Sequence, residues 1–71
     1  MPAGKPAVPQ DVVETIQREL ERAGHRVMTA EEIEALSDMT RCNAYVWAVN
    51  QRDGFKAELP HDVCQSMWRW V

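Results

Sequence analysis

The sequence has no long hydrophobic run and only two cysteines, Cys42 and Cys64. Its uninterrupted apolar stretches are a few residues long, whereas a helix that spans a bilayer needs about 20. We find no pattern typical of a secretory signal, a transit peptide or a lipidation motif. Two cysteines without dense spacing do not make a disulfide framework. We therefore expect a cytoplasmic chain with reduced thiols and no contact with a membrane.

Positive charge is also scarce, because eight Lys and Arg residues stand against eleven Asp and Glu, and the net charge is −3. A protein whose affinity rests on phosphate contacts needs the opposite sign, so this balance disfavours nucleic-acid binding by a single copy. A chain of 71 residues forms one domain, and it is too small for a deep catalytic cleft. We expect no enzymatic activity and no cofactor.

Residues 1–8 have few large side chains and include Pro2, Gly4 and Pro6. This composition is typical of a flexible arm, because it offers little surface to bury and interrupts regular structure. Hydrophobic residues make up 45% of the whole chain, which is enough for one small core. The sequence thus predicts a flexible arm over residues 1–8 and a helical domain over residues 9–71.

The stretch over residues 9–23 predicts the first helix. Its apolar residues recur at steps of three and four, which places them on one side of a helix. Pro9 suits the first turn, and Gly24 suits the position just after the end. The apolar side consists of Val12, Val13, Ile16, Leu20 and Ala23.

A second helix is predicted over residues 30–37. Thr29 and Glu32 have the spacing of a capping box, in which the side chain of each accepts a hydrogen bond from the backbone of the other. Met28 and Ile33 have the spacing of a hydrophobic staple, which fixes the angle between the incoming chain and the helix.

Thr40 can cap a third helix over residues 41–52, which ends at Asp53-Gly54. The connection between the second and third helices is then about three residues long. Asp38 lies within this connection, and aspartate tolerates a left-handed backbone better than most residues do. The residues that we expect to be at least partly buried are Ala44, Tyr45, Trp47, Ala48 and Val49.

A last helix is predicted over residues 60–70, after a short connector over residues 55–59. Pro60 suits a helix start, and apolar residues follow at steps of four and three, namely Val63, Met67 and Trp70. The sequence therefore predicts an all-α fold, a small single domain of three to four helices with a helix-turn-helix-like pair.

Residues 29–47 resemble the helix-turn-helix of small phage and plasmid regulators. The matching pieces are Thr29-Ala30-Glu31-Glu32-Ile33, the turn Leu36-Ser37-Asp38-Met39, the pair Thr40-Arg41, and Tyr45 with Trp47. The chain departs from the family at Glu34, where a small residue usually packs between the helices, and at Asp38, which is usually glycine. The resemblance implies a DNA-binding transcriptional regulator that acts as a dimer.

The resemblance also implies that the third helix presents its outer side to DNA. Arginine suits the acceptor atoms of guanine, asparagine suits adenine, and a helix start suits a phosphate. The implied outer side consists of Arg41, Cys42, Asn43, Val46, Asn50 and Arg52. The candidate DNA-binding residues are Thr40, Arg41, Asn43, Asn50 and Arg52, and each of them is also consistent with an ordinary cap, turn or surface residue.

The charge of residues 29–54 indicates an alternative, because five acidic residues against two arginines give this segment −3. An acidic protein-binding module, such as a phage-type inhibitor or adaptor, would dock on a basic partner surface. Trp68 and Trp70 point to different sides of a helix, so either Trp68 is a half-exposed residue or it belongs to an apolar patch for a partner or a homodimer. The candidate partner-binding residues are Glu31, Glu34, Asp38, Met67, Trp68 and Val71.

His61 and Cys64 are three residues apart on the predicted last helix, where Cys42 or His25 could join them. The sequence has no further ligand pair with the spacing of a zinc site. It also has no evident third group to orient a Cys–His pair for catalysis. We therefore predict neither a metal site nor a catalytic site.

Overall fold

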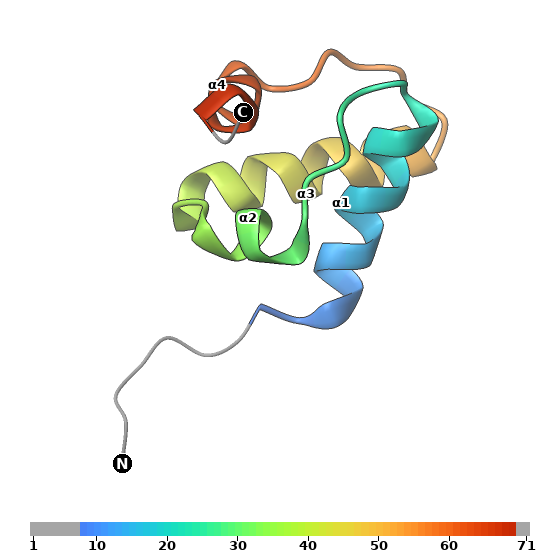
Figure 1. Cartoon of the computed structure of the whole chain (residues 1–71). Coiled ribbons are helices and arrows are strands. Elements are labelled where there is room, and N and C mark those ends of the chain that lie inside the picture. Colours follow the sequence, from blue (N-terminus) through green and yellow to red (C-terminus); the bar gives the residue numbers. More distant parts are fainter. Residues whose placement is uncertain (1–7, 70–71) are drawn as a thin grey trace.

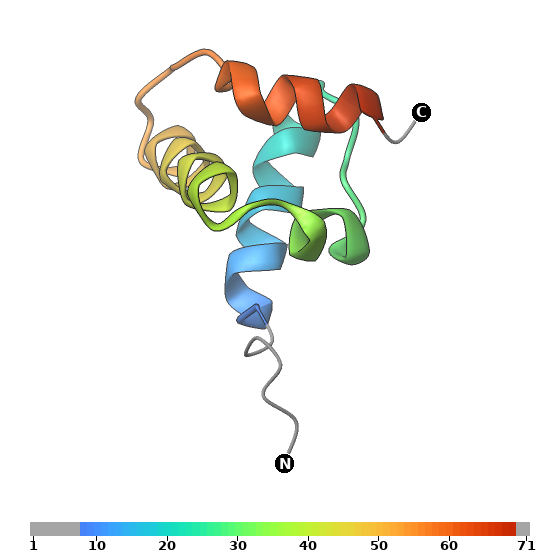
Figure 2. The ribbon, with the colours of Figure 1, turned by 90° about the vertical axis from the view of Figure 1, so that its left-hand side faces the viewer.

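The computed structural model describes residues 8–69, and that part of the chain consists of helices without a strand. This confirms the all-α fold. In Figures 1 and 2 the last helix lies above the first and the third. The helices are α1 (Gln10–Arg22), α2 (Ala30–Ala35), α3 (Asp38–Arg52) and α4 (His61–Arg69).

α1 forms where the first helix was predicted and is one residue shorter at each end. Gly24 follows it with a φ of +81°, which lets the N–H of His25 donate to the carbonyl of Leu20 at 2.9 Å. Ala23 is the exposed C-cap residue, so its predicted place on the apolar side is wrong. Val12 is half-buried, and the fully buried apolar residues of the helix are Val13, Ile16 and Leu20.

The start of α2 confirms both patterns predicted from the sequence. The N–H of Glu32 donates to Oγ1 of Thr29 at 3.1 Å, and the N–H of Thr29 donates to Oε1 of Glu32 at 2.8 Å. Met28 and Ile33 are both fully buried, as a hydrophobic staple requires. The helix ends at Ala35, before the predicted end.

The connection between α2 and α3 consists of Leu36 and Ser37. Ser37 caps α3 in place of Thr40, because Oγ of Ser37 accepts a hydrogen bond from the N–H of Thr40 at 3.2 Å. α3 therefore begins at Asp38, earlier than predicted. The predicted left-handed turn at Asp38 is wrong, since only glycines have a positive φ in the described part. Asp38 instead lies in the first turn of α3, where its carboxylate is close to the positive end of the helix dipole.

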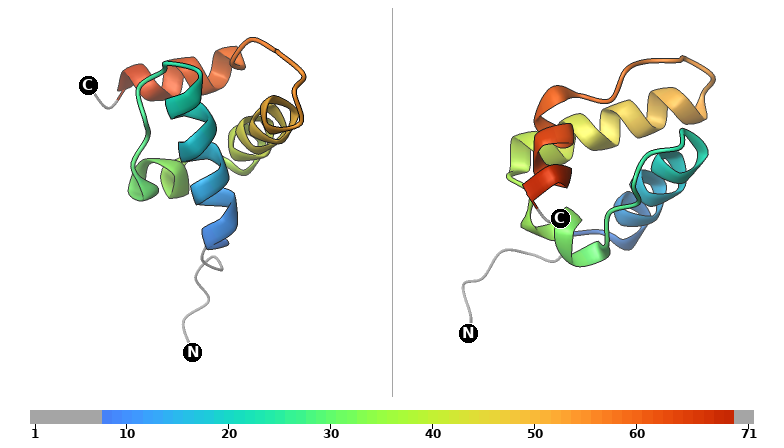
Figure 3. Two further views of the ribbon diagram at one scale, coloured as in Figure 1. Left: turned by 90° about the vertical axis from the view of Figure 1, so that its right-hand side faces the viewer. Right: turned by 45° about the horizontal axis from the view of Figure 1, so that its top comes forward.

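α4 packs against α3, and in the left view of Figure 3 it crosses above the end of α1. Nε1–H of Trp47 donates to the carbonyl of Ala57 at 3.0 Å, which ties the connector before α4 to α3. Pro60 immediately precedes α4, and Trp70 lies outside the described residues. The core consists of Val13, Ile16, Leu20, Met28, Ile33, Leu36, Ala44, Trp47, Ala48, Val63 and Met67.

The predicted arm over residues 1–8 lies outside the described residues except for Val8. That residue is half-buried and packs against the core. The packed domain therefore includes at least one residue that the composition assigned to the arm.

Candidate interaction surface on helix α3

One side of α3 points away from the rest of the molecule. In Figure 2 and in the left view of Figure 3, α3 is seen along its axis at one edge, with the other helices on its inner side. Met39 is 75% exposed and Val46 is 51% exposed, although both are large and apolar. We call this side the outer face of α3. It consists of Met39, Cys42, Asn43, Val46 and Asn50, which are all exposed and uncharged.

The apolar residues of the outer face have the spacing of a helix seam. Met39, Cys42 and Val46 follow one another at steps of three and four, and the half-buried Val49 comes three residues later. This is the a/d alternation of helices that pack side by side. The core uses other positions of the same heptad, at Ala44, Trp47 and Ala48. α3 therefore has one side that is packed against its own domain and a second with the pattern of an interface.

Arg41 does not lie on the outer face, although the resemblance placed it there. Its side chain is only 14% exposed and folds back onto the C-terminal end of α2. Nη2 donates to the carbonyl of Leu36 at 2.9 Å, and Nε donates to the carbonyl of Ile33 at 3.4 Å. Nη1 also lies 3.4 Å from Oδ1 of Asp38. Arg41 thus donates hydrogen bonds to carbonyls that the end of α2 leaves without a partner, and these bonds hold the end of α2 to α3.

Thr40 and Asn43 are engaged with α4 and with the cap of α3. Nδ2 of Asn43 donates to Oδ2 of Asp62 at 3.1 Å, and Oγ of Ser37 donates to Oγ1 of Thr40 at 2.9 Å. The hydrogen bond from Asn43 is the main reason why the pKa of Asp62 is lowered, and Thr40 adds to it against the opposing effect of burial. Both residues therefore take part in holding α4 beside α3.

Asn50 and Arg52, the other two candidate DNA-binding residues, are exposed in the last turns of α3. Nε of Arg52 lies 3.8 Å from Oδ1 of Asp53, an exposed ion pair that contributes little free energy. Of the five candidates, the structure places Asn43 and Asn50 on the outer face. Thr40, Arg41 and Arg52 lie on other sides of α3.

The acidic candidates for partner binding are exposed on other parts of the surface. Glu31 and Glu34 point outward from α2, which lies on the opposite side of α1 from α3 in Figure 2. Glu34 does not pack between the helices, so no carboxylate is buried at that position. Asp38 is 86% exposed at the start of α3. Asp38 therefore lies at the end of the outer face, whereas Glu31 and Glu34 lie away from it.

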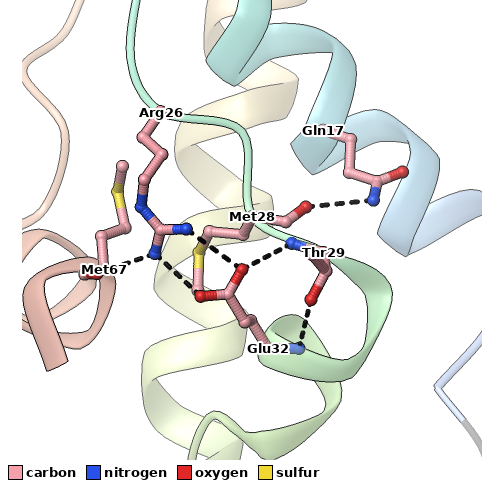
Figure 4. A network of polar contacts seen from close by, with 6 residues as sticks. All are labelled: Gln17, Arg26, Met28, Thr29, Glu32 and Met67. Atoms are coloured by element: carbon pink, nitrogen blue, oxygen red, sulfur yellow. Dashed lines mark hydrogen bonds and ion pairs between the residues drawn. The ribbon is translucent and has the colours of Figure 1, made fainter. Parts of the chain in front are cut away.

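A polar network at the start of α2 is the main feature that the sequence did not reveal (Figure 4). Nη2 of Arg26 lies 2.8 Å from Oε2 of the buried Glu32, and the same nitrogen donates to the carbonyl of Met67 at 2.7 Å. Nε2 of Gln17 donates to the carbonyl of Met28 at 3.0 Å. The network joins α1, the loop before α2, α2 itself and α4. Only the capping box within it has a sequence signature.

The guanidinium of Arg26 is also the main electrostatic influence on Glu32. Its hydrogen bonds lower the pKa of Glu32, and the backbone N–H of Thr29 lowers it further, against the effect of burial. The same contact raises the pKa of Arg26. Glu32 is therefore held in its ionised form as part of the architecture.

Of the predicted C-terminal patch, the structure exposes Trp68 and buries Met67. Trp68 is 75% exposed, which is more than the half exposure that its position suggested. Met67 belongs to the core, with 8% exposure, because it faces the inner side of α4. Val71 lies outside the described residues. Trp68 borders a shallow cavity that Leu59, Cys64 and Met67 help to line.

Both cysteines are free, Cys42 exposed on α3 and Cys64 half-buried on α4. Sγ of Cys64 lies 3.9 Å from the carbonyl of Leu59. Within the described part of the chain, His, Cys, Asp and Glu side chains do not form a group of three or more that could hold a metal ion. None of the helices described is long and apolar enough to span a bilayer.

Comparison of the chain with protein-family models, with curated proteins and with solved structures finds no match.

Proposed function

We propose that this chain is a small protein-binding module that docks a helix of its partner on the outer face of α3. The observation that carries the proposal is the exposed a/d seam of Met39, Cys42 and Val46 along a helix of 15 residues. Full burial of a methionine or valine side chain contributes roughly 1.5–3 kcal/mol. A partner helix that covers the seam would gain part of this free energy, because Met39 is 75% and Val46 51% exposed in the single chain.

The distribution of charge favours a protein partner over a polyanion. The outer face carries no lysine or arginine, and the arginine nearest to it in sequence, Arg41, is directed to the end of α2. Phosphate contacts supply most of the affinity of DNA-binding proteins, and they require cations at the surface that meets the DNA. An uncharged face with an apolar centre is instead typical of the core of a protein interface.

Acidic residues at the margin favour a partner with basic residues around its apolar strip. Asp38 and Asp53 are exposed at the two ends of α3. Complementary charges around an interface increase the association rate and select the partner more than they raise affinity. The expected partner surface is therefore an amphipathic helix with cations near its ends.

The test is binding of a labelled amphipathic peptide with leucine at the a and d positions of about three heptads. Fluorescence anisotropy should show binding to the wild-type chain and its loss in Val46→Glu. Val27→Glu is the matched control, because Val27 is 40% exposed in the loop before α2, outside the outer face. Equal binding by all three proteins, or by none, would contradict the proposal.

Reading of DNA by α3 is the second candidate. It is supported by the connection of two residues between α2 and α3, and by the exposed Asn43 and Asn50 on the outer face. In this case a chain that acts as a dimer should retain labelled DNA fragments at low salt and release them steeply as salt rises. Absence of retention at low salt would eliminate this candidate.

A further inference from the structure

We infer that the helix that docks on the outer face is α3 of a second copy of this chain, packed antiparallel across a twofold axis. The inference rests on the proposed function, because it uses the same face and names its occupant. It follows from the spacing of the seam and from the placement of charge around it.

The seam is complementary to itself in the antiparallel direction. With the twofold axis midway between Cys42 and Val46, each Cys42 faces Val46 of the other copy, and each Met39 faces Val49 of the other copy. These are the a–d layers of an antiparallel helix pair. A symmetric dimer requires such a patch, in which every contact occurs twice.

Charge allows this approach although both copies are acidic. The chain carries a net charge of −3, so two copies repel each other over most of their surfaces. Between Met39 and Gln51 the only charged residue of α3 is Arg41, which is turned away from the seam. Antiparallel packing also brings the exposed Asp38 of each copy toward the C-terminal end of the other α3, where Arg52 is exposed beside Asp53. The contact is therefore uncharged at its centre, and at each end one arginine stands between two acidic residues.

The size of the seam predicts a weak dimer. α3 has 15 residues and is about 22 Å long, so the pair buries less than the roughly 1,200–2,000 Å² of a stable protein interface. A contact of this size is typical of transient association, so concentrated samples are needed to populate the dimer.

Sedimentation equilibrium of the full chain measures the association directly. From about 10 μM to about 1 mM the weight-average mass should rise from 8.2 kDa toward twice that value. Val46→Glu places two carboxylates in the central layers and should lower the association constant by at least about tenfold. Val27→Glu, which adds the same charge elsewhere, should associate like the wild type.

Thiol chemistry locates the contact. In a Cys64→Ser background Cys42 is the remaining thiol, and its rate of alkylation should fall as the protein concentration rises. Adding Val46→Glu should abolish this protection. Mild oxidation of a chain with Cys64→Ser and Val46→Cys should join position 42 of one copy to position 46 of the other, as peptide mapping would show. Links of 42 to 42 would indicate a parallel pair and contradict the proposed packing.

The outcomes separate this inference from the proposed function. A chain that stays monomeric up to about 1 mM but binds the leucine peptide retains a docking face and has another occupant. A chain that neither associates nor binds the peptide contradicts both proposals. A dimer that persists in Val46→Glu with Cys42 unprotected uses a different surface, and it overturns the inference.

Discussion

The start of α2 and the outer face of α3 lie only a few residues apart in sequence and use their side chains in opposite ways. Around Glu32, charged and polar groups are buried and bonded to one another, and they join α4 to the loop before α2. Along the outer face, apolar side chains are exposed and charge is absent. The comparison shows that the charges of Arg26 and Glu32 stabilise the packing of the helices. The outer face of α3, which is apolar and uncharged, is the surface available to a partner.

The largest effect is expected for Glu32→Ala, which removes the ion pair with Arg26 and half of the capping box. The side chain of Arg26 is 39% exposed, so water can solvate it after the loss, and the free energy of unfolding should fall by about 2 kcal/mol through the lost cap and charged hydrogen bonds. Urea denaturation followed by circular dichroism measures the change. Glu31→Ala, at the exposed neighbouring position, should change it by less than about 0.5 kcal/mol. Similar values for the two variants would show that the network does not hold the fold.

The next effect is a loss of stability in acid. The pKa values of Glu32 and Asp62 are lowered in the folded chain, so their contribution is fully present above their unfolded values, about 4.3 and 3.9. It is lost as the pH falls through the lower folded values. The urea midpoint should therefore drop between about pH 5 and pH 3. Glu32→Gln should lower the midpoint at neutral pH and flatten its decline in acid. An unchanged slope would exclude Glu32 as a cause.

A smaller effect is expected for Arg41→Ala. The variant loses the hydrogen bonds to the carbonyls of Leu36 and Ile33, which should lower the free energy of unfolding by about 1–2 kcal/mol. Arg52→Ala removes an exposed ion pair and should change stability by less than about 0.5 kcal/mol. If Arg41→Ala instead unfolds like the wild type and loses salt-dependent DNA retention, Arg41 reads DNA and the second candidate function gains support.

The smallest effect on folding is expected for Val46→Glu in dilute solution, where the chain is a monomer. Val46 is half exposed, so the monomer should unfold within about 0.5 kcal/mol of the wild type. Thermal denaturation at micromolar concentration measures this. A large destabilisation would mean that the outer face supports the fold. A loss of binding in this variant would then reflect unfolding and not the loss of an interface.

Local signals predicted the helices well where a single cap or turn residue was available. The capping box at Thr29 and the staple of Met28 with Ile33 fixed the start of α2, and Gly24 marked the end of α1. The start of α3 was misplaced because Ser37 and Thr40 are both good N-caps. They are three positions apart, so only one can be the cap, and the structure selects Ser37.

The candidate site was less predictable. Helix periodicity predicts which side of a helix a residue occupies, but it does not predict its hydrogen-bond partners on other helices. The resemblance placed Arg41 and Asn43 toward DNA. In the structure Arg41 donates to carbonyls of α2, whereas Asn43 stays on the exposed outer face and its side chain donates to Asp62 of α4. These contacts join positions on different helices, and no spacing within one helix encodes them.

The sequence by itself determined the all-α fold, the helix caps and the alternation of apolar and polar residues along each helix, because these depend on neighbours within a few positions. Only the tertiary structure decided three other features. These are the hydrogen bond from Arg26 to α4, the burial of Met67 and the exposure of the seam on α3. Each of these depends on which two helix faces meet. α3 has apolar residues on more than one side, and the packing of α1 and α4 determines which side remains free.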